Sequence, residues 1–255
     1  MNHEEVISAV RKSDQAWCEQ VGNWESLGHG VAYCAKEFSS LPDVNQLRDV
    51  WLADTEPHAA YEQTEAHYQA HGATCHLWVP GSGQPIEPVE SFLAGKGWHR
   101  EELTALGLTA AEVSDSNEDE SIRILPARAM QRAYRRSLSE SSAGNEDYVN
   151  AGFERLDDAN HDAFLALVDG DAAGRISYLE VGDVAAVMDF HVTPKHQERG
   201  VALALMAHVL RLARRLLPRV LATRMPAEDR TGQAFLKRCG FSEAGTLTQF
   251  RRSDG

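Results

Sequence analysis

The sequence predicts an α/β fold built around a mixed β-sheet, and three observations support that prediction. Short β-prone runs alternate with helical patterns from residue 121 onwards. A D-G turn in this region separates two apolar runs, which is typical of a β-hairpin. Prolines and glycines stand where helices and strands are expected to end. The expected order is strand, helix, three antiparallel strands, helix, strand, helix and strand.

The first of these elements are a short strand, a helix and a loop. Residues 121–125 are β-prone and stop at Pro126. Residues 127–138 are rich in Ala, Met, Gln and Arg, which favour a helix. Residues 139–150 are polar and contain a glycine, so we expect a loop there.

Three antiparallel strands are expected next. Residues 162–168 and 173–181 are apolar runs on either side of Asp169-Gly170-Asp171, which predicts a hairpin. Residues 184–192 form a third, largely apolar run that ends before Pro194.

The remaining elements alternate between helix and strand. Residues 201–217 carry apolar side chains at helical spacing, with arginines near the C-terminal end, where the helix dipole favours cations. Pro218 stops this helix. We expect the last three elements at residues 220–225 (strand), 229–239 (helix, closed by Gly240) and 241–251 (strand).

Charge is distributed unevenly along the 255 residues, whose formal net charge is −13. Residues 1–120 hold 6 basic and 21 acidic residues and carry −15, whereas residues 121–255 hold 19 and 17 and carry +2. An anionic ligand therefore meets less repulsion in the second part. So acidic a chain is a poor candidate for binding nucleic acid or a membrane, and we expect neither partner.

Several classes of protein do not fit this sequence. No apolar run is long enough to cross a bilayer and the N-terminus has no secretion-signal pattern, so we expect a cytoplasmic location. The four cysteines form no C-x-x-C pair, which argues against a disulfide framework or a zinc knuckle. His191 and His196 have no further ligand residues nearby in sequence, so we expect no metal.

The segment between the third strand and the next helix is a candidate anion site. It reads Gln197-Glu198-Arg199-Gly200-Val201-Ala202. The first-turn amides of a helix have no internal partner, and small residues such as Gly200 and Ala202 let a ligand approach the backbone. A phosphate or pyrophosphate fits such a place. An ordinary helix start with a glycine turn explains the same pattern.

Three segments of this region resemble the GNAT superfamily of N-acetyltransferases. Gln197-x-x-Gly200-x-Ala202 resembles its (Arg/Gln)-x-x-Gly-x-(Gly/Ala) motif. Residues 165–178 resemble its hairpin, and Phe235-Leu236-Lys237-Arg238-Cys239-Gly240-Phe241 resembles its second signature, Phe/Leu-Tyr-x-x-x-Gly-Phe. The resemblance covers residues 122–252 and implies the GNAT acyl-CoA N-acyltransferase fold there.

The first half of the chain echoes the second signature. Residues 92–98 share its F-L-x-x-x-G-aromatic pattern, and they follow a strand-like run at 75–80 and a helical composition at 59–71. We therefore predict two tandem GNAT copies, with an unrelated helical extension as the alternative for the first. The predicted division is a degenerate GNAT-like or helical domain at 1–111, an acidic linker at 112–121 and a GNAT acetyltransferase domain at 122–255.

The resemblance implies acetyl-CoA as co-substrate, held between the strands at 184–192 and 220–225. It places the pantetheine along the first of these strands and the pyrophosphate on the loop and first helical turn. Asp229 stands where the family commonly has an Asn. The implied cofactor-binding residues are Phe190, His191, Val192, Gln197, Glu198, Arg199, Gly200, Val201, Ala202 and Asp229.

The candidate catalytic residues are Glu180, Asp189 and His191. One of them would take the proton of the amine, whose pKa of about 10.4 keeps it charged at neutral pH. His191 has a suitable ordinary pKa. A strand histidine bonded to backbone and plain surface carboxylates are the structural alternatives. Leu236 stands where the family frequently has a Tyr that acts as general acid toward the CoA thiolate.

These observations lead to one leading function and two alternatives. The leading function is an N-acetyltransferase that moves an acetyl group from acetyl-CoA to a primary amine by direct attack, with a small-molecule or protein amine as acceptor. The first alternative is a non-catalytic acyl-CoA-binding sensor or scaffold protein, which Leu236 favours. The second makes the first half a protein-interaction module that brings a partner protein for acetylation. The acceptor, the acyl chain length and the oligomeric state stay open.

Overall fold

The computed structural model describes residues 2–52, 55–109 and 121–253. The predicted acidic linker at 112–121 lies outside these residues except for Ser121. Within the described part of the chain, every helix is too short or too polar to span a membrane.

The chain divides into two compact units, and each unit contains segments that are distant in sequence. The bounds are Met1–Asp14 with Thr104–Gly245 for unit 1, and Gln15–Leu103 with Thr246–Gly255 for unit 2. Helix α1 (His3–Glu19) and strands β5 (Trp98–Leu108) and β11 (Ser242–Arg252) contribute residues to both units. The domain division drawn from the sequence stays a prediction.

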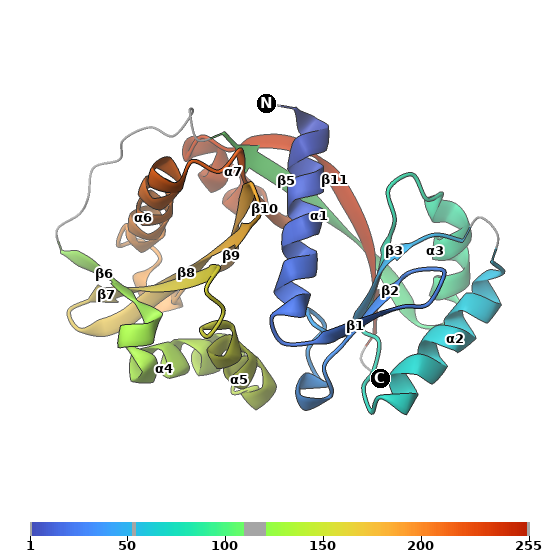
Figure 1. Cartoon of the computed structure of the whole chain (residues 1–255). Helices are drawn as coiled ribbons and strands as arrows, with labels where there is room; N and C mark the ends of the chain where they lie inside the picture. Colours follow the sequence, from blue (N-terminus) through green and yellow to red (C-terminus); the bar gives the residue numbers. More distant parts are fainter. Residues whose placement is uncertain (1, 53–54, 110–120, 254–255) are drawn as a thin grey trace. The chain divides into compact units, whose positions relative to one another are not determined.

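Unit 1 is a mixed sheet with helices on both faces (Figure 1). Its strands follow the order β5-β10-β9-β8-β7-β6. Strands β6 to β9 pair antiparallel with one another, whereas β9 and β10 pair parallel. The bounds of its strands and helices are β6 Ile122–Pro126, α4 Gln131–Ser141, α5 Glu146–Arg155, β7 His161–Val168, β8 Asp171–Val181, β9 Val184–Val192, α6 Val201–Leu216, β10 Val220–Pro226 and α7 Arg230–Arg238.

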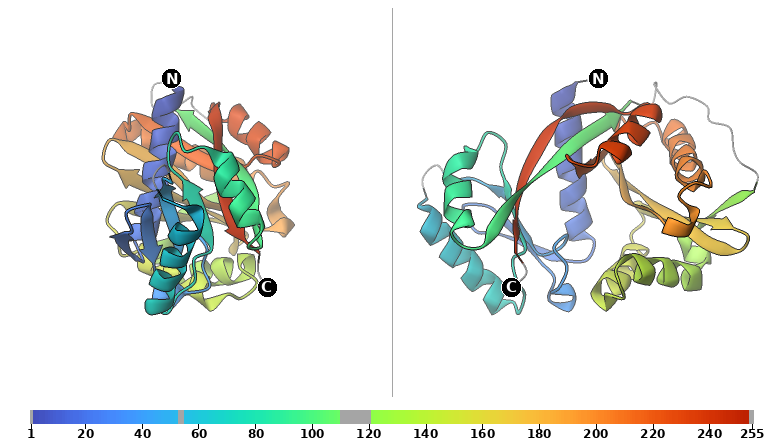
Figure 2. Two further views of the ribbon diagram at one scale, coloured as in Figure 1. Left: turned by 90° about the vertical axis from the view of Figure 1, so that its right-hand side faces the viewer. Right: turned by 180° about the vertical axis from the view of Figure 1, so that it is seen from behind.

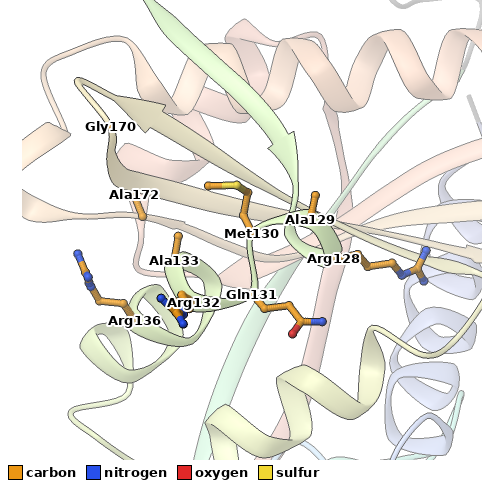
Figure 3. Close-up of a pocket in the computed structure, with 9 residues that line it drawn as sticks. All are labelled: Arg128, Ala129, Met130, Gln131, Arg132, Ala133, Arg136, Gly170 and Ala172. Carbon is orange, nitrogen blue, oxygen red and sulfur yellow. The ribbon is translucent and has the colours of Figure 1, made fainter.

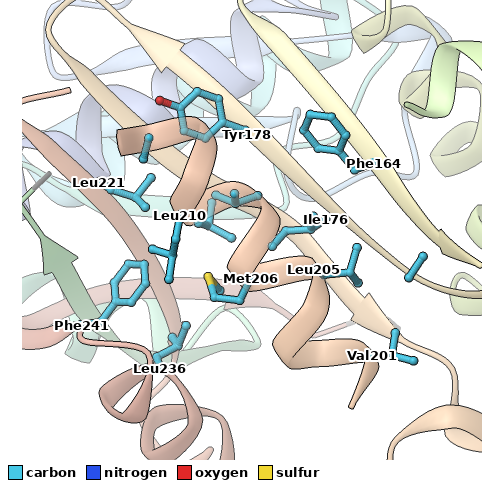
Figure 4. Close-up of a cluster of buried hydrophobic side chains, with 14 of the residues drawn as sticks. Phe164, Ile176, Tyr178, Val201, Leu205, Met206, Leu210, Leu221, Leu236 and Phe241 are labelled. Carbon is cyan, nitrogen blue, oxygen red and sulfur yellow. The ribbon is translucent and has the colours of Figure 1, made fainter. Parts of the chain in front are cut away.

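Two hydrophobic clusters lie on opposite faces of this sheet, because side chains alternate along each strand. Phe164 of β7 belongs to the cluster that contains Leu205 of α6, part of which Figure 4 shows. The next residue, Leu165, belongs to the cluster that contains Tyr134 of α4. The strands at the centre of unit 1 are therefore packed from both sides, which fixes their register.

The loop predicted at residues 139–150 is wrong, because one helix ends and another begins within it. Helix α4 continues to Ser141, and α5 starts after Asn145. The Asn145 side chain accepts a hydrogen bond from the amide of Tyr148 at 3.1 Å and so caps α5. Burial of apolar residues such as Val149 outweighs the polar composition on which the loop prediction rested.

The other elements predicted from residue 121 onwards are present. The third antiparallel strand covers the predicted residues 184–192, and the remaining elements differ from their predicted bounds by a few residues. The predicted helix at 127–138 is preceded by a short 3-10 turn, η3 (Ala127–Ala129). The predicted α/β fold with a mixed sheet is confirmed.

Unit 2 has its own strands and helices. Its strands follow the order β1-β2-β3-β4-β11-β5. Strand β3 pairs antiparallel with β2 and parallel with β4, and β11 pairs antiparallel with β4. Tyr68 of α2 and Leu93 of α3 belong to one hydrophobic cluster with Leu47 and Trp78 of the strands. Figure 2 shows the ribbons of these two helices beside the strands of unit 2. The bounds are β1 Asn23–Ser26, β2 Val31–Cys34, β3 Gln46–Val50, α2 Pro57–Ala70, β4 Leu77–Pro80 and α3 Ile86–Ala94.

The two units repeat one order of elements. In unit 2 an antiparallel pair (β2, β3) is followed by α2, the parallel strand β4, α3 and β5. In unit 1 an antiparallel pair (β8, β9) is followed by α6, the parallel strand β10, α7 and β11. The helix and strand predicted at 59–71 and 75–80 correspond to α2 and β4. Whether the first copy is a degenerate GNAT-like domain stays a prediction.

Candidate functional site

Strands β9 and β10 separate part-way along their length. Their parallel ladder ends at the pair Ala186 and Ala222, although the strands continue to Val192 and Pro226. Beyond this point their facing backbone groups have no ladder partner in each other. An extended ligand that carries its own amide groups can pair with such an edge.

A β-bulge lies in β9 beside this opening. The β8–β9 register shifts between Arg175 and Ser177, so that Asp189 and Phe190 both stand opposite one residue of β8. Asp189 has a φ of 41°, in the left-handed region. A non-glycine residue adopts this region at a cost of roughly 1–3 kcal/mol and keeps it only where its surroundings hold it there.

The guanidinium of Arg175 holds Asp189 through a buried, two-pronged ion pair. Its Nε donates to Oδ2 and its Nη2 to Oδ1, each at 2.7 Å. The two side chains are 2% and 10% exposed. The hydroxyl of Tyr148 donates to the same carboxylate at 2.7 Å. Removal of either charge would leave the other one buried without its partner.

Arg175 also links this strand pair to α4 and α5. Its Nη1 donates to the carbonyl and hydroxyl oxygens of Ser137 at 3.0 and 3.2 Å, and its Nη2 to the hydroxyl of Ser141 at 2.9 Å. Burial raises the pKa of Tyr148 and the charge of Asp189 raises it further, so the phenol stays protonated. We call Arg175, Asp189 and Tyr148 the Arg175 cluster; it holds the bulge in place.

His191 stands opposite Arg175 on the β8–β9 ladder and is half-buried. Burial lowers the pKa of His191 below its ordinary 6.5, and the charge of Arg175 lowers it further, against the opposite effects of Asp189 and Glu140. The imidazole is therefore neutral at pH 7 and able to accept a proton.

The structure separates the other predicted carboxylates from this cluster. Glu180 pairs with Ala185 near the far end of the β8–β9 ladder. Asp229 accepts a hydrogen bond from the amide of Gly232 at 2.9 Å and caps α7. Of the three predicted catalytic residues, Asp189 and His191 are brought together.

The loop between β9 and α6 leaves the start of α6 without a side-chain cap. Gly200 precedes the helix with a φ of 73° and no capping hydrogen bond, whereas Asn145 and Asp229 cap α5 and α7. The nearest atom to a Cβ placed on Gly200 is Cδ1 of Ile122, at 3.9 Å, so the space beside it is open. The first-turn amides of α6 are available to a ligand.

The first part of this loop is anchored to β8. The amide of Thr193 donates to the carbonyl of Ala173 at 2.9 Å, and the hydroxyl of Thr193 lies 2.9 Å from Nδ1 of His196. His196 is buried within the turn η4 (Pro194–His196). The next three residues, Gln197 to Arg199, are exposed. His196 thus has a structural role. Residues 197–200 of the predicted anion site face solvent, whereas Val201 is buried in the core of unit 1 and contributes its backbone alone.

Two hollows lie beside α4, and the first of them borders this loop. One, of about 440 Å³, lies between α4 and η4 and includes Arg136 and Lys195. The other, of about 480 Å³, lies between the start of α4 and the β7–β8 turn (Figure 3). Arg128, Arg132 and Arg136 line this second hollow, and Arg128 also donates to the carbonyl of Leu156 at 2.7 Å. Arg132 and Arg136 give this surface positive charge. Lys195 lies 3.3 Å from Asp171, and Glu140 also lines the first hollow.

Leu236, at the position of the family tyrosine, belongs to the core of unit 1. It is 3% exposed and lies close to Phe241 (Figure 4). The preceding residue, Phe235, faces Phe190 of β9, with ring centroids 5.8 Å apart. Helix α7 therefore presents an aromatic ring to β9 at this point, and Leu236 offers no hydroxyl.

Comparison with protein families locates these features in one domain. Residues 127–241 match the family model described as acetyltransferase (GNAT) family. These residues form a GNAT acetyltransferase domain. The domain includes the β9–β10 opening, the Arg175 cluster and the loop before α6. No curated protein matches the sequence significantly.

Solved structures share the fold over most of the chain. A functionally unknown conserved protein from Staphylococcus epidermidis has a TM-score of 0.71 at 14% identity, over 91% of this chain and 95% of that one. A GCN5-related N-acetyltransferase from Kribbella flavida has a TM-score of 0.67 at 13% identity, over 98% and 96%. A tandem GNAT protein from the clavulanic acid biosynthesis pathway has 0.52 at 16%, over 77% and 70%. At such identities the likeness concerns the fold.

Sequence reasoning missed the Arg175 cluster and the arginines of α4. The signal for the cluster was the presence of opposite charges, Arg175 and Asp189, in two adjacent and otherwise apolar strands. The sequence gives no such signal for Tyr148, because its polar surroundings predict a loop where α5 lies. Arg132 and Arg136 stand at helical i, i+4 spacing, which places them on one face.

Proposed function

We propose that the chain is an N-acyltransferase that moves an acetyl group from acetyl-CoA to a primary amine by direct attack. The observation that carries this proposal is that the β9–β10 opening leads, through the end of β9, to the uncapped start of α6. The opening offers backbone groups to the amides of the pantetheine. The helix start offers free amides and the positive end of a dipole to the pyrophosphate.

The proposed cofactor contacts follow the chain from the bulge to α6. Residues 190–192 lie along the opening, and residues 197–202 form the anion site. Arg132 and Arg136 add positive charge beside it, whereas Lys195 is paired with Asp171. Residues 121–255 carry +2, so they repel an anionic ligand less than the acidic first part does. We assign Asp229 to capping α7.

The proposed reaction forms a bond between the amine nitrogen and the thioester carbonyl carbon and breaks the carbon–sulfur bond. The amine must lose a proton to attack, and we assign that proton to the neutral imidazole of His191, directly or through a water. The departing thiolate takes up a proton from solvent or the protein. The attacking nitrogen loses a second proton as the tetrahedral intermediate collapses, which offsets the proton that the thiolate takes up. The products are an amide, free CoA thiol and the proton on His191, which passes to solvent.

The Arg175 cluster acts through the backbone in this proposal. The extra residue of a bulge leaves an amide outside the strand ladder. An amide at the β9 bulge is available to the acyl oxygen, on which negative charge develops during attack. Asp189 is then a positioning residue rather than the base, because its carboxylate already binds Arg175 and Tyr148.

A non-catalytic acyl-CoA sensor is the second candidate, and the burial of Leu236 favours it. Without a hydroxyl at this position, another group or solvent must protonate the thiolate. A thiol has an ordinary pKa of about 8.5, so the thiolate is a leaving group that tolerates this loss. We therefore prefer the N-acyltransferase to the sensor.

For residues 1–111 we propose a degenerate GNAT-like copy. The repeated order of elements supports it. So does the left-handed backbone of Asp49 in β3, whose φ is 52°, since Asp189 in the corresponding strand β9 has a φ of 41°. The segment after β3 lacks the glycine motif of residues 197–202, so we place acetyl-CoA in unit 1. The acidic composition of the first half favours a cationic amine as acceptor.

Titration calorimetry of acetyl-CoA into the purified chain tests the cofactor site. We expect micromolar binding by the wild type and none by Gly200→Asp, which adds a negative charge beside the pyrophosphate. Gly200→Asn is the matched control, because Asn has the same size and also tolerates a left-handed backbone. It should retain more affinity than Gly200→Asp. Equal binding by folded Gly200→Asp and wild type contradicts the proposed site.

Release of CoA thiol, followed with a thiol reagent, tests turnover. The acceptors are a panel of small amines and a set of lysine-containing peptides. Turnover with small amines supports the enzyme with a small acceptor, and turnover with peptides alone supports a protein acceptor. Binding of acetyl-CoA without turnover on either panel supports the sensor.

A further inference from the structure

Unit 2 contains a group of metal-capable side chains that has no part in the proposed acyl transfer. Glu25 lies on β1, His67 on the last turn of α2, and His71 at the C-cap of α2. One ligand atom from each lies within 4.8 Å of the other two. Among the residues that the structure describes, this is the group of three or more such side chains that meets this spacing.

The two histidines are oriented for metal binding. They stand at i, i+4 spacing, with ring centroids 4.4 Å apart. Nδ1 of His71 lies 2.8 Å from the carbonyl oxygen of His67. A carbonyl oxygen only accepts, so Nδ1 carries the proton and Nε2 keeps its lone pair. This second-shell bond fixes the tautomer that a metal ligand needs.

Hydrogen bonds on both sides of His67 hold α2 against the β1–β2 hairpin. The side chain of Gln63 donates to the carbonyl of Leu27 at 3.2 Å, and the hydroxyl of Tyr68 donates to the carbonyl of Tyr33 at 2.8 Å. The side chain of His67 is only 10% exposed, and its Nδ1 lies 3.8 Å from Oε2 of Glu25. The backbone that carries the three side chains is therefore fixed before any ion binds.

The local charges favour a cation here. The last turn of a helix carries the negative end of the helix dipole. Residues 1–120 carry a net charge of −15.

We propose that Glu25, His67 and His71 bind a divalent transition-metal ion of the Zn²⁺ class. Two imidazoles and a carboxylate are ligands that Zn²⁺ prefers, and water completes the tetrahedron. Ligand atoms of a tetrahedral Zn²⁺ site lie roughly 3.4 Å apart. We infer that the ion draws the side chain of Glu25, which is 63% exposed, and the exposed ring of His71 toward His67 to reach that spacing. The bound ion joins β1, an edge strand of four residues, to α2.

Calorimetric titration of ZnCl₂ into the untagged, chelator-treated chain tests this site. We expect one Zn²⁺ per chain, with an affinity that falls roughly tenfold or more in His67→Asn and in His71→Asn, because loss of second-shell partners alone weakens metal binding about 10–100-fold. His58→Asn is the matched control. His58 lies on the same helix, exposed and 3.5 Å from Glu62, and it should bind Zn²⁺ like the wild type.

Thermal melting separates metal binding from folding. Without metal, His71→Asn should melt close to the wild type because His71 is exposed, whereas His67→Asn should melt lower because the His67 side chain is only 10% exposed. Each variant is therefore compared with itself in the presence and absence of Zn²⁺. With Zn²⁺, the melting temperature should rise for the wild type and His58→Asn but not for the double variant His67→Asn/His71→Asn. The proposal is overturned if the folded wild type shows no stoichiometric binding, or if the double variant binds and is stabilised as the wild type is.

Discussion

At the scale of single residues, the buried ion pair of Arg175 and Asp189 holds the backbone of the β9 bulge in unit 1. Both charges are buried, and Tyr148 and two serines satisfy their remaining hydrogen-bonding groups. The same contacts hold the backbone of Asp189 in its left-handed conformation. Loss of one partner therefore leaves a buried charge and releases the bulge at once.

We expect Asp189→Asn to lower the free energy of unfolding by roughly 3–5 kcal/mol, measured by urea denaturation, because it leaves the Arg175 charge buried without its partner. Asp183→Asn is the control, since Asp183 pairs with Arg219 at the surface. It should leave the free energy of unfolding nearly unchanged. Similar losses in the two variants would show that the buried pair has no special weight.

His191 gives a pH dependence whose sign follows from its lowered pKa. The unfolded chain binds the His191 proton more readily than the folded one, so stability rises with pH up to the ordinary value of 6.5 and then levels off. Between about pH 7 and pH 5 the wild type should lose more stability than His191→Asn. Denaturation curves at these two pH values measure the difference, and parallel losses would contradict a lowered pKa.

At the scale of elements, α4 combines packing with a charged face toward the loop before α6. We expect Arg132→Ala/Arg136→Ala to raise the dissociation constant of acetyl-CoA and to make it less sensitive to salt, because exposed charges attract an anion through a screened field. Arg135→Ala is the control on the same helix. Arg135 pairs with Glu146 at 3.7 Å and lies over the ring of Phe153, and its loss should not change the salt dependence of calorimetric affinity.

The sequence predicts helices and strands correctly where the apolar pattern is strong. It misses a helix where a side-chain cap determines that the helix begins. The strand at 184–192 was found because its apolar run is continuous, whereas α5 was missed because Asn145 acts as a cap through a specific side-chain bond. The turn before α6 was predicted from Gly200, which has a φ of 73°, and its binding of an anion stays a prediction. The bulge at Asp189 was not predicted, because a register shift depends on tertiary contacts of Arg175 that no local pattern encodes.

At the scale of the whole molecule, each of the two units is built from two segments that are far apart in sequence. Residues 246–255 belong to unit 2, although they follow the last segment of unit 1, and residues 1–14 belong to unit 1. Phe250 of β11 pairs with Trp78 of β4 and is 1% exposed in the cluster that also holds Leu47. A division of the chain near residue 111 therefore removes a strand from unit 2.

We expect Phe250→Ala to lower the free energy of unfolding by roughly 3–5 kcal/mol, because it opens a cavity in the core of unit 2. Leu216→Ala is the control, since Leu216 is 47% exposed, and its effect should be small. Chemical denaturation followed by tryptophan fluorescence suits the measurement, because all five tryptophans precede residue 111. A loss no greater than that of Leu216→Ala would show that β11 is dispensable to unit 2.

The discontinuity of each unit in sequence has a consequence for synthesis on the ribosome. Chains grow at about 5–20 residues per second, so residues 246–253 emerge about 8 to 33 seconds after β4, the strand of unit 2 with which they pair. During that interval the edge of β4 and the apolar surface around Trp78 lack their partner. Residues 1–14 likewise lack their partners until residues 104–245 of unit 1 have been synthesised. The nascent chain therefore exposes incomplete surfaces that a chaperone can bind, and neither unit is complete before most of the other has been translated.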